Sequence, residues 1–182
     1  LGQLEDDMLG RTDEAIAAWR EVLAIDPSDL RALAALEGLL DRDGRRDESL
    51  DVLEKRALLL EDDDERRATL LKAAAGWDEL GDREHARELY ERVRASAQDN
   101  LLALERLAAI YRDRRGGPML VEILLERSEL VDDVHQQLQL LHEVAQVYER
   151  ELGDQESAFY VLQAAFNRDD RHEQTRTELE RL

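Results

Sequence analysis

The chain has 182 residues, of which 43% are hydrophobic, and carries a formal net charge of −19 with no cysteine. The acidic balance argues against nucleic-acid binding, because phosphate recognition needs a basic face. The lack of cysteine excludes disulfides and thiolate metal sites, and the sequence has no run of about 18 apolar residues that would predict membrane insertion.

The N-terminal segment predicts the end of one helix, a corner at Gly10 and a second helix. Leu4–Leu9 is interpreted as the end of a helix whose beginning is missing. The second helix places Ala15 and Leu23 on one stripe, since apolar residues three or four apart share a helix face. Residues 26–29 (Asp-Pro-Ser-Asp) then end this helix and supply a cap for the next one.

The rest of the chain predicts pairs of antiparallel helices. The first helix of each pair is expected around 33–40, 70–77, 104–111 and 141–148, and the second around 50–57, 86–93, 120–130 and 158–165. Gly81-Asp82 and Gly153-Asp154 join a residue suited to ending a helix with one suited to capping the next. Connections of about three to five residues favour antiparallel neighbours.

Corresponding residues after five corners recur at spacings of 34, 37, 34 and 38: Ala15, Ser49, Ala86, Leu120 and Ala158. A period in this range indicates stacked copies of one helical unit. Over two units the spacing is 71 or 72, so residues 30–86 align with 101–158, which has one extra residue. The longer units carry their additional residues near 61–66 and 132–137 and lengthen the turn or its flanking helices there.

This pattern resembles the tetratricopeptide repeat (TPR). Residues that fit the TPR signature are Gly10, Ala15, Trp19, Val22 and Pro27 in one half-repeat, and Leu70, Ala73, Ala74, Trp77, Gly81, Ala86, Tyr90 and Val93 in a whole unit. The closing proline appears once, and Leu120 replaces a small residue. The resemblance covers essentially all 182 residues. It implies an all-α, right-handed α-α superhelix of about eleven antiparallel helices, with partial repeats at both ends.

We predict a single array over residues 1–182. Its repeats are 1–29 (partial), 30–66, 67–100, 101–137, 138–170 and 171–182 (partial). Neither end resembles a polar capping repeat, so the chain is expected to be a segment of a larger bacterial protein, for example one in signalling or secretion. A cytoplasmic location is expected because no signal or membrane segment is recognised.

The resemblance also implies a groove, lined by the first helices, that receives a peptide or helix of a partner. The groove positions of the family fall on Arg31, Ala34, Gly38, Arg42, Leu71, Ala75, Leu102, Ala109, Arg112, His142 and Gln146. Small and apolar residues in a concavity are typical of peptide binding. The alternative is that Leu71 and Leu102 belong only to the core between repeats. The Lys and Asn residues with which some family members clamp acidic C-terminal peptides are absent.

Other polar clusters are interpreted as structural, and no cofactor or metal site is predicted. The acidic run Glu61–Glu65 suits a helix N-terminus better than a calcium loop, because it lacks alternate ligand spacing and a glycine. Trp19 and Trp77 are expected to fill the core. The histidines lack the spacing of a zinc site and are expected at the surface or in the groove. They are His85, His135, His142 and His172.

The sequence therefore favours a non-enzymatic protein-interaction scaffold whose partner is a neutral or basic protein or peptide. One alternative is an array that associates end to end through its incomplete terminal helices. A second is an enzyme on helical hairpins, such as a glycosidase with two carboxylates, for which the short loops leave little room. A third is an RNA-binding helical repeat, which the acidic balance disfavours.

Overall fold

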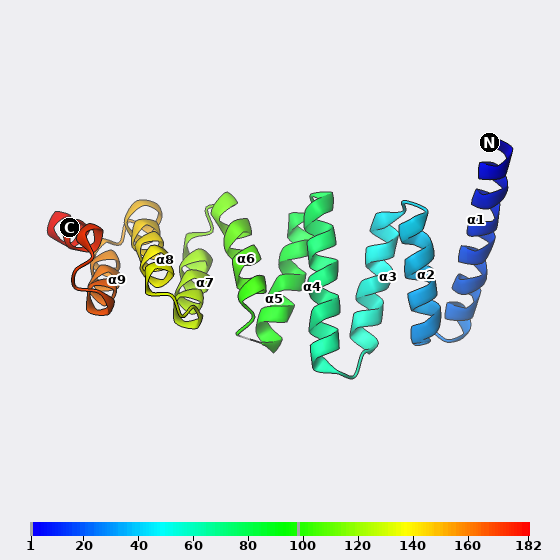
Figure 1. Cartoon of the computed structure of the whole chain (residues 1–182), viewed down its shortest axis with the longest axis horizontal. Helices are drawn as coiled ribbons and strands as arrows, with labels where there is room; N and C mark the ends of the chain where they lie inside the picture. Colours follow the sequence, from blue (N-terminus) through cyan, green and yellow to red (C-terminus); the bar gives the residue numbers. More distant parts are fainter. Residues whose placement is uncertain (1, 98) are drawn as a thin grey trace. The chain divides into compact units, whose positions relative to one another are not determined.

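The chain folds into α-helices throughout. The structure, a computed structural model, describes residues 2–97 and 99–182, with side chains from Arg11 onward. This part holds ten α-helices, one π-helical segment and no strand (Figure 1). The elements are α1 (Gly2–Ile25), α2 (Leu30–Arg42), α3 (Arg46–Leu59), α4 (Asp63–Leu80), α5 (Arg83–Ser96), α6 (Leu101–Asp113), α7 (Gly117–Leu130), α8 (Val134–Val147), η1 (Tyr148–Leu152), α9 (Gln155–Arg168) and α10 (Glu173–Arg181). Leu1, where the first predicted repeat begins, lies outside the described residues.

Helices that follow one another in the chain pack together. In this way α1 to α4 form one series, and α6 to α10 form another. The residues group into two compact units, one ending at Leu89 and one beginning at Tyr90, and the division falls inside the continuous helix α5. The predicted all-α array of helical hairpins is confirmed. The right-handed superhelix and the repeat boundaries stay predictions.

Capping residues begin the first helix of most pairs. Asp29 accepts hydrogen bonds from the backbone N–H groups of Arg31 (2.8 Å) and Ala32 (3.0 Å). The same role is played by Asp62, Asn100 and Asp133 for α4, α6 and α8. Such side chains satisfy N–H groups that the helix itself leaves unpaired. The cap predicted in residues 26–29 is thus confirmed.

The two Gly-Asp corners are also confirmed. Gly81 and Gly153 adopt φ values of 87° and 67°, in the left-handed region that glycine enters without steric cost. Asp82 and Asp154 follow and accept hydrogen bonds from backbone N–H groups at the start of α5 and α9. Each corner therefore ends one helix and starts the next within two residues.

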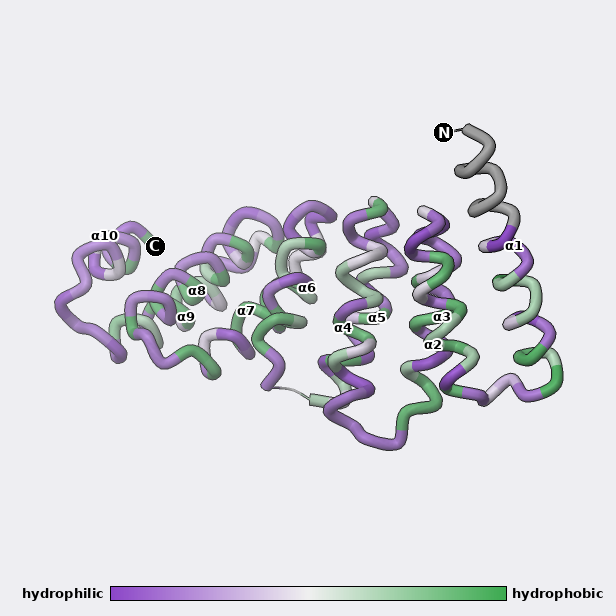
Figure 2. Tube along the Cα trace, turned by 45° about the vertical axis from the view of Figure 1, so that its right-hand side comes forward, coloured by the Kyte–Doolittle hydropathy of each residue, from purple (hydrophilic) through white to green (hydrophobic). Residues whose placement is uncertain are grey.

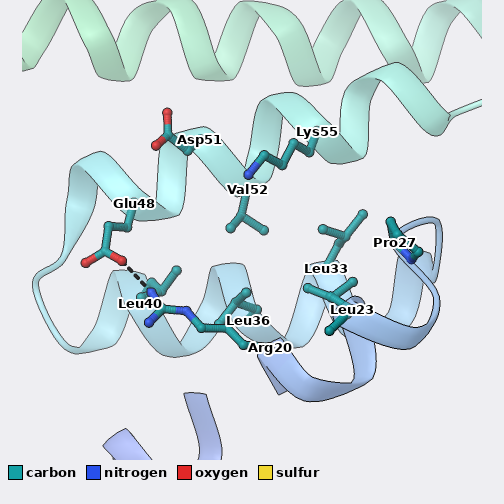
Figure 3. A pocket seen from close by; sticks show the side chains of 11 residues that line it. Arg20, Leu23, Pro27, Leu33, Leu36, Leu40, Glu48, Asp51, Val52 and Lys55 are labelled. Atoms are coloured by element: carbon teal, nitrogen blue, oxygen red, sulfur yellow. Dashed lines mark hydrogen bonds and ion pairs between the residues drawn. The ribbon is translucent and has the colours of Figure 1, made fainter. Parts of the chain in front are cut away.

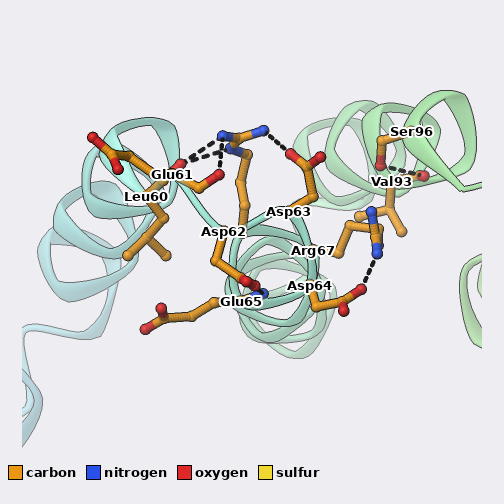
Figure 4. Close-up of polar contacts among 10 residues, drawn as sticks. Leu60, Glu61, Asp62, Asp63, Asp64, Glu65, Arg67, Val93 and Ser96 are labelled. Atoms are coloured by element: carbon orange, nitrogen blue, oxygen red, sulfur yellow. Dashed lines mark hydrogen bonds and ion pairs between the residues drawn. The ribbon is translucent and has the colours of Figure 1, made fainter.

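The acidic run begins α4. Asp62 is the N-cap, and Asp63, Asp64 and Glu65 occupy the first turn, where carboxylates are stabilised by the helix dipole. Figure 4 shows Leu60 and the acidic residues of this turn. Arg66 closes the turn by donating to the backbone oxygen of Leu60 and to Asp63. The interpretation of this run as a helix start is confirmed.

The apolar core follows the helix faces that the sequence pattern predicts. Figure 2 shows hydrophobic and hydrophilic residues alternating along α2 to α4, as expected for helices with one buried face. In the N-terminal unit Ile16, Leu33, Leu36, Leu40 and Val52 form one buried cluster, and Trp19 packs against it. In the C-terminal unit buried clusters join α8 to α9. Within the described residues, no helix is both long and apolar enough to cross a membrane.

The double repeat is visible in the helix lengths. We call residues 30–86 the N-terminal doublet and residues 101–158 the C-terminal doublet. Helices α2 and α6 both have 13 residues, and α3 and α7 both have 14. The 18-residue α4 corresponds to the 14-residue α8 followed by the 5-residue η1. The additional residues of the longer units therefore lengthen the first helix of the pair.

The one extra residue of the C-terminal doublet is absorbed by the π-helical segment η1. In the N-terminal doublet the N–H groups of Gly81 and Asp82 donate to the carbonyl of Trp77. The N–H groups of Gly153 and Asp154 donate to Tyr148 in the same way, but one residue further along the chain. A π turn is the usual way for a helix to hold an inserted residue, and the corner after it is unchanged.

The corner predicted at Gly10 is wrong, because α1 continues from Gly2 to Ile25. Residues 30–182 hold the nine helices expected there, so the count over the described part of the chain is ten and not eleven. A glycine inside a helix costs only about 1 kcal/mol. A separate helix before Gly10 would be too short to be stable without a large buried face, so continuing one helix is favoured.

Candidate functional site

The groove positions of the N-terminal unit lie on the first helices α2 and α4. Arg31, Ala34 and Arg42 are exposed on α2. Gly38 lies between them, and the space that a side chain would occupy there is open. On α4, Leu71 and Ala75 are half-buried. This face of α2 is therefore smooth and accessible.

The groove positions of the C-terminal unit lie on α6 and α8. Leu102 is 49% exposed, which does not fit the alternative that it belongs only to the core. Ala109, Arg112 and Gln146 are also exposed. His142 is buried, contrary to the expectation of a surface or groove position, because the start of α10 covers it.

A pocket of about 220 Å³ opens between α2, α3 and α4, and we call it the α2–α4 pocket. Of the predicted residues, Ala75 lines it. The other lining residues are Glu37, Asp41, Arg46, Ser49, Leu50, Leu53, Lys72, Gly76 and Glu79.

Buried Glu37 organises this pocket. Its carboxylate accepts from Lys72 Nζ (2.9 Å) and pairs with Arg56. Arg46 forms an ion pair with Glu79 at the rim. Asp41 makes no side-chain hydrogen bond or ion pair with the described residues, so one carboxylate of the rim is available to a ligand.

The equivalent pocket of the C-terminal unit, of about 210 Å³, lies between α6, α7 and α8, and we call it the α6–α8 pocket. The predicted residues Arg112 and Gln146 line it, together with Leu120, Glu143, Val147, Arg150 and Glu151. Arg112 forms a bidentate ion pair with Glu143, at 2.5 and 2.9 Å. The hydrogen bond to Glu143 raises the pKa of Arg112, and burial opposes this effect only in part.

The two pockets occupy the same place in the two doublets, but two pairs of equivalent residues carry opposite charges. Asp41 corresponds to Arg112, and Lys72 corresponds to Glu143, 71 residues later in each case. Both pairs of positions are on first helices. The same pocket therefore occurs twice. The acid Asp41 on α2 is replaced by the base Arg112 on α6, and the base Lys72 on α4 is replaced by the acid Glu143 on α8.

A third pocket, of about 230 Å³, lies between α8 and the start of α10 and includes three histidines: His135, His142 and His172. The Thr175 hydroxyl lies 2.8 Å from His142 Nε2 and 2.8 Å from His172 Nδ1. Burial, and then the neighbouring His172, lower the pKa of His142, because both disfavour a charged ring. Among the described side chains, no group of three or more His, Asp or Glu is arranged to hold a metal ion.

Trp77 and His85 form a polar contact that the sequence did not predict. Trp77 is half-buried, and its Nε1 donates to Glu54 Oε1 at 2.5 Å. His85 Nε2 lies 2.8 Å from the same oxygen, and its ring centroid is 4.7 Å from that of Trp77. Trp77 therefore joins α4 to α3 by packing and by a hydrogen bond.

Sequence reasoning missed the central role of Glu37. The available signal was a glutamate between Leu36 and Leu40 on an apolar stripe, where a charge needs a partner. Its partners Arg56 and Lys72 come from two different helices. Their distances along the chain give no fixed spacing that would have identified them.

No family model matches the chain, and no curated protein matches its sequence. Among solved structures, a MamA protein superimposes with a TM-score of 0.50 at 17% identity, covering 92% of this chain and 87% of the other. YrrB, described as a TPR protein with an unusual peptide-binding site, gives 0.50 at 14% identity, covering 97% and 87%.

The N-terminal domain of stress-induced protein-1 from C. elegans gives a TM-score of 0.50 at 12% identity, covering 64% of this chain and 94% of the other. At such identities the likeness concerns the fold alone. Together with the confirmed Gly-Asp corners and the repeating helix lengths, it leads to one conclusion: this chain has the fold of a tetratricopeptide-repeat array.

Proposed function

We propose that the chain is a protein-interaction module that binds a peptide or helix of a partner protein along its first helices. The observation that carries this proposal is the pair of equivalent pockets, the α2–α4 pocket and the α6–α8 pocket, in which equivalent residues differ in charge. Concave apolar or mixed surfaces between helices are common sites for peptides. The smooth, open face around Gly38 gives such a segment access to the first pocket.

The charges in the two pockets suggest the polarity of the ligand. Asp41 has no described ion-pair partner in the α2–α4 pocket, and Arg150 has none in the α6–α8 pocket. A segment with a basic residue would complement Asp41 in the first pocket, and a segment with an acidic residue would complement Arg150 in the second. The net charge of −19 favours basic partners at longer range.

We propose that this site acts without catalysis. General acid–base chemistry needs a carboxyl group that is free to exchange a proton with a substrate. A glycosidase needs two such groups, whereas in the α2–α4 pocket Glu37 and Glu79 are held in ion pairs with Lys72, Arg56 and Arg46. Asp41 is the one carboxylate of this pocket without an ion pair among the described residues. The ion pairs support a structural role for Glu37 and Glu79 and weaken the glycosidase alternative.

A selection from a displayed library of random peptides tests the proposed function. Binders to the whole chain are measured against two variants that put a long side chain on the first-helix face, Gly38→Arg and Ala109→Arg. Both positions are accessible, so the fold should be kept. We expect Gly38→Arg to weaken binders of the α2–α4 pocket, and Ala109→Arg to weaken binders of the α6–α8 pocket, by about tenfold or more, the effect of losing one good contact.

The matched control is Gln163→Arg, which adds the same charge at an exposed position on the second helix α9. It should leave binding unchanged. The proposal fails if binders are indifferent to both groove variants, or if the control weakens them equally, since the effect would then come from charge alone.

A further inference from the structure

A cavity of about 430 Å³ lies between α1, α2 and α3, about twice the volume of either first-helix pocket. We call it the α1–α3 pocket. It meets another side of α2 from the α2–α4 pocket. Its lining residues are Arg20, Leu23, Ala24, Pro27, Leu33, Leu36, Leu40, Glu48, Asp51, Val52 and Lys55. None of the predicted groove positions is among them.

The interior of this pocket is apolar. Figure 3 shows Leu23 on α1, Leu33 and Leu36 on α2, and Val52 on α3 around one space. Leu33, Leu36 and Val52 are buried, and Leu23 is half-buried. The charged residues stand at the rim, on α1 and α3. This combination of an apolar floor with a few polar groups at the edge is typical of a binding pocket, as is the volume.

The equivalent place in the C-terminal unit is filled by the protein itself. Arg94 stands where α1 has Leu23, 71 residues earlier, and its side chain is only 12% exposed. Its guanidinium donates to Glu126 at 2.9 and 2.6 Å and also pairs with Glu122. In the α1–α3 pocket the residue equivalent to Glu126 is Lys55, so neither partner of this contact is present.

A second closing contact is missing as well. In the C-terminal unit the Tyr111 hydroxyl donates to Glu91 at 2.8 Å. The residues equivalent to these two are Leu40 and Arg20, which form no such hydrogen bond. Polar side chains therefore fill the space between α5, α6 and α7. The equivalent space between α1, α2 and α3 is an apolar pocket.

The rim decides which occupant fits. Arg20 is paired with Glu48 at 2.5 Å, so their charges cancel. Asp51 and Lys55 lie one turn apart on α3, are exposed, and make no ion pair with the described residues. With one unpaired charge of each sign, the rim favours an uncharged side chain in the pocket and a partner that carries both signs beside it.

We propose that the α1–α3 pocket docks an amphipathic helix of a partner protein, which inserts one apolar side chain the size of leucine, methionine or phenylalanine. A basic and an acidic residue on that helix, spaced to reach Asp51 and Lys55, complete the contact. This surface is separate from the first-helix pockets, so the chain has two docking sites of different chemistry.

The test uses a displayed library of random peptides of about 15 residues, enough for four helical turns, selected on the whole chain. The key variant is Leu23→Arg/Lys55→Glu, which transfers the Arg94–Glu126 contact into the pocket and fills it. We expect selected peptides to share an apolar residue flanked by a base and an acid at helical spacing. Their affinity should fall about tenfold or more on this variant.

A second variant, Asp51→Lys/Lys55→Asp, changes only exposed side chains and cannot fail through loss of core packing. It should weaken the selected peptides, and peptides with the two charges exchanged should regain affinity. The proposal is overturned if the peptides bind both variants as tightly as the original chain. It is also overturned if they lack an apolar anchor, or if Gly38→Arg blocks them, since they would then occupy the first-helix groove.

Discussion

The N-terminal and C-terminal doublets have the same sequence of helices and corners but different interiors. Glu37 in the first is replaced by Ala108 in the second, although the basic residue of α3 that pairs with Glu37 is kept as Arg127 on α7. As a result Arg127 Nε is buried without a hydrogen-bond partner among the described residues. The two doublets therefore share their corners and helix lengths, which preserve the backbone. The side chains that fill the space between the helices differ from one doublet to the other.

The largest expected effect comes from removing the charge that only the N-terminal doublet has. Glu37→Ala should lower the free energy of unfolding by about 3 kcal/mol, because Arg56 loses a buried partner. Urea unfolding followed by circular dichroism measures this. Glu79→Ala removes an exposed ion pair with Arg46 and is the control, with an expected loss below about 1 kcal/mol.

The reciprocal change sharpens this comparison. Ala108→Glu supplies Arg127 with the partner that Arg56 already has, so it should cost no more than about 1 kcal/mol despite burying a charge. A loss as large as that of Glu37→Ala would mean that the two interfaces are not equivalent, and the assignment of Arg127 to the place of Arg56 would be wrong.

A somewhat smaller effect on the free energy of unfolding is expected where the two doublets place large and small side chains differently. Gly76 is packed under Leu50, and a Cβ atom at Gly76 would lie 2.4 Å from the Leu50 side chain. The equivalent residues are Val147 and Val121, both buried. Gly76→Val should cost about 2 kcal/mol through overpacking, and combining it with Leu50→Val should recover at least about 1 kcal/mol of the summed losses.

Gly38→Ala provides the contrast, because its site is open. It should stabilise the chain by up to about 1 kcal/mol through helix propensity alone. If Gly76→Val were equally stabilising, the close approach of α3 and α4 would not be a constraint on the N-terminal doublet.

A weaker effect should be a difference between the doublets in how the free energy of unfolding depends on pH. His142 stands at the place of Leu71, and burial lowers its pKa below 6.5. The unfolded chain then binds the proton more tightly, so this histidine's contribution is complete above about pH 6.5 and is lost as the pH falls toward the folded pKa. Unfolding measured between about pH 7 and pH 5 should show this loss, and His142→Leu should remove it. A slope unchanged in that variant would assign the effect to another group.

The smallest effect should follow from shortening η1. Deleting the exposed residue Glu151 restores the residue count of the N-terminal doublet, whose corner at Gly81 forms without a π turn. The free energy of unfolding should change by less than about 1 kcal/mol, as for most surface changes. Far-ultraviolet circular dichroism should show the same helix content. Loss of the fold on deletion would show that the π turn is needed for packing.

The sequence predicted those parts of the structure that depend on local chemistry. The Gly-Asp corners, the cap at Asp29 and the helix start at the acidic run follow from residues close together in the chain. Whether the longer units lengthen the turn or its flanking helices was left open. The end of one helix at Gly10 was predicted in error, because a glycine permits a corner without requiring one. Burial of His142 depends on Thr175 and the start of α10, which lie far along the chain.

The candidate sites were less predictable than the fold. Three predicted residues, Ala75, Arg112 and Gln146, line the two first-helix pockets. The α1–α3 pocket was not predicted, since its apolar residues match an ordinary core stripe. The difference appears only when Leu23 is compared with its equivalent, Arg94. In the C-terminal unit this polar side chain covers the apolar stripe, and in the N-terminal unit none does.

The π turn has a consequence for how such a chain can change. An added residue at Tyr148–Leu152 is absorbed before Gly153, and the cap at Asp154 is rebuilt on the same pattern as at Asp82. The end of a long first helix can therefore gain or lose a residue without disturbing the helices that follow. It is also where a reporter residue for labelling could be introduced with the least disturbance to the neighbouring helices.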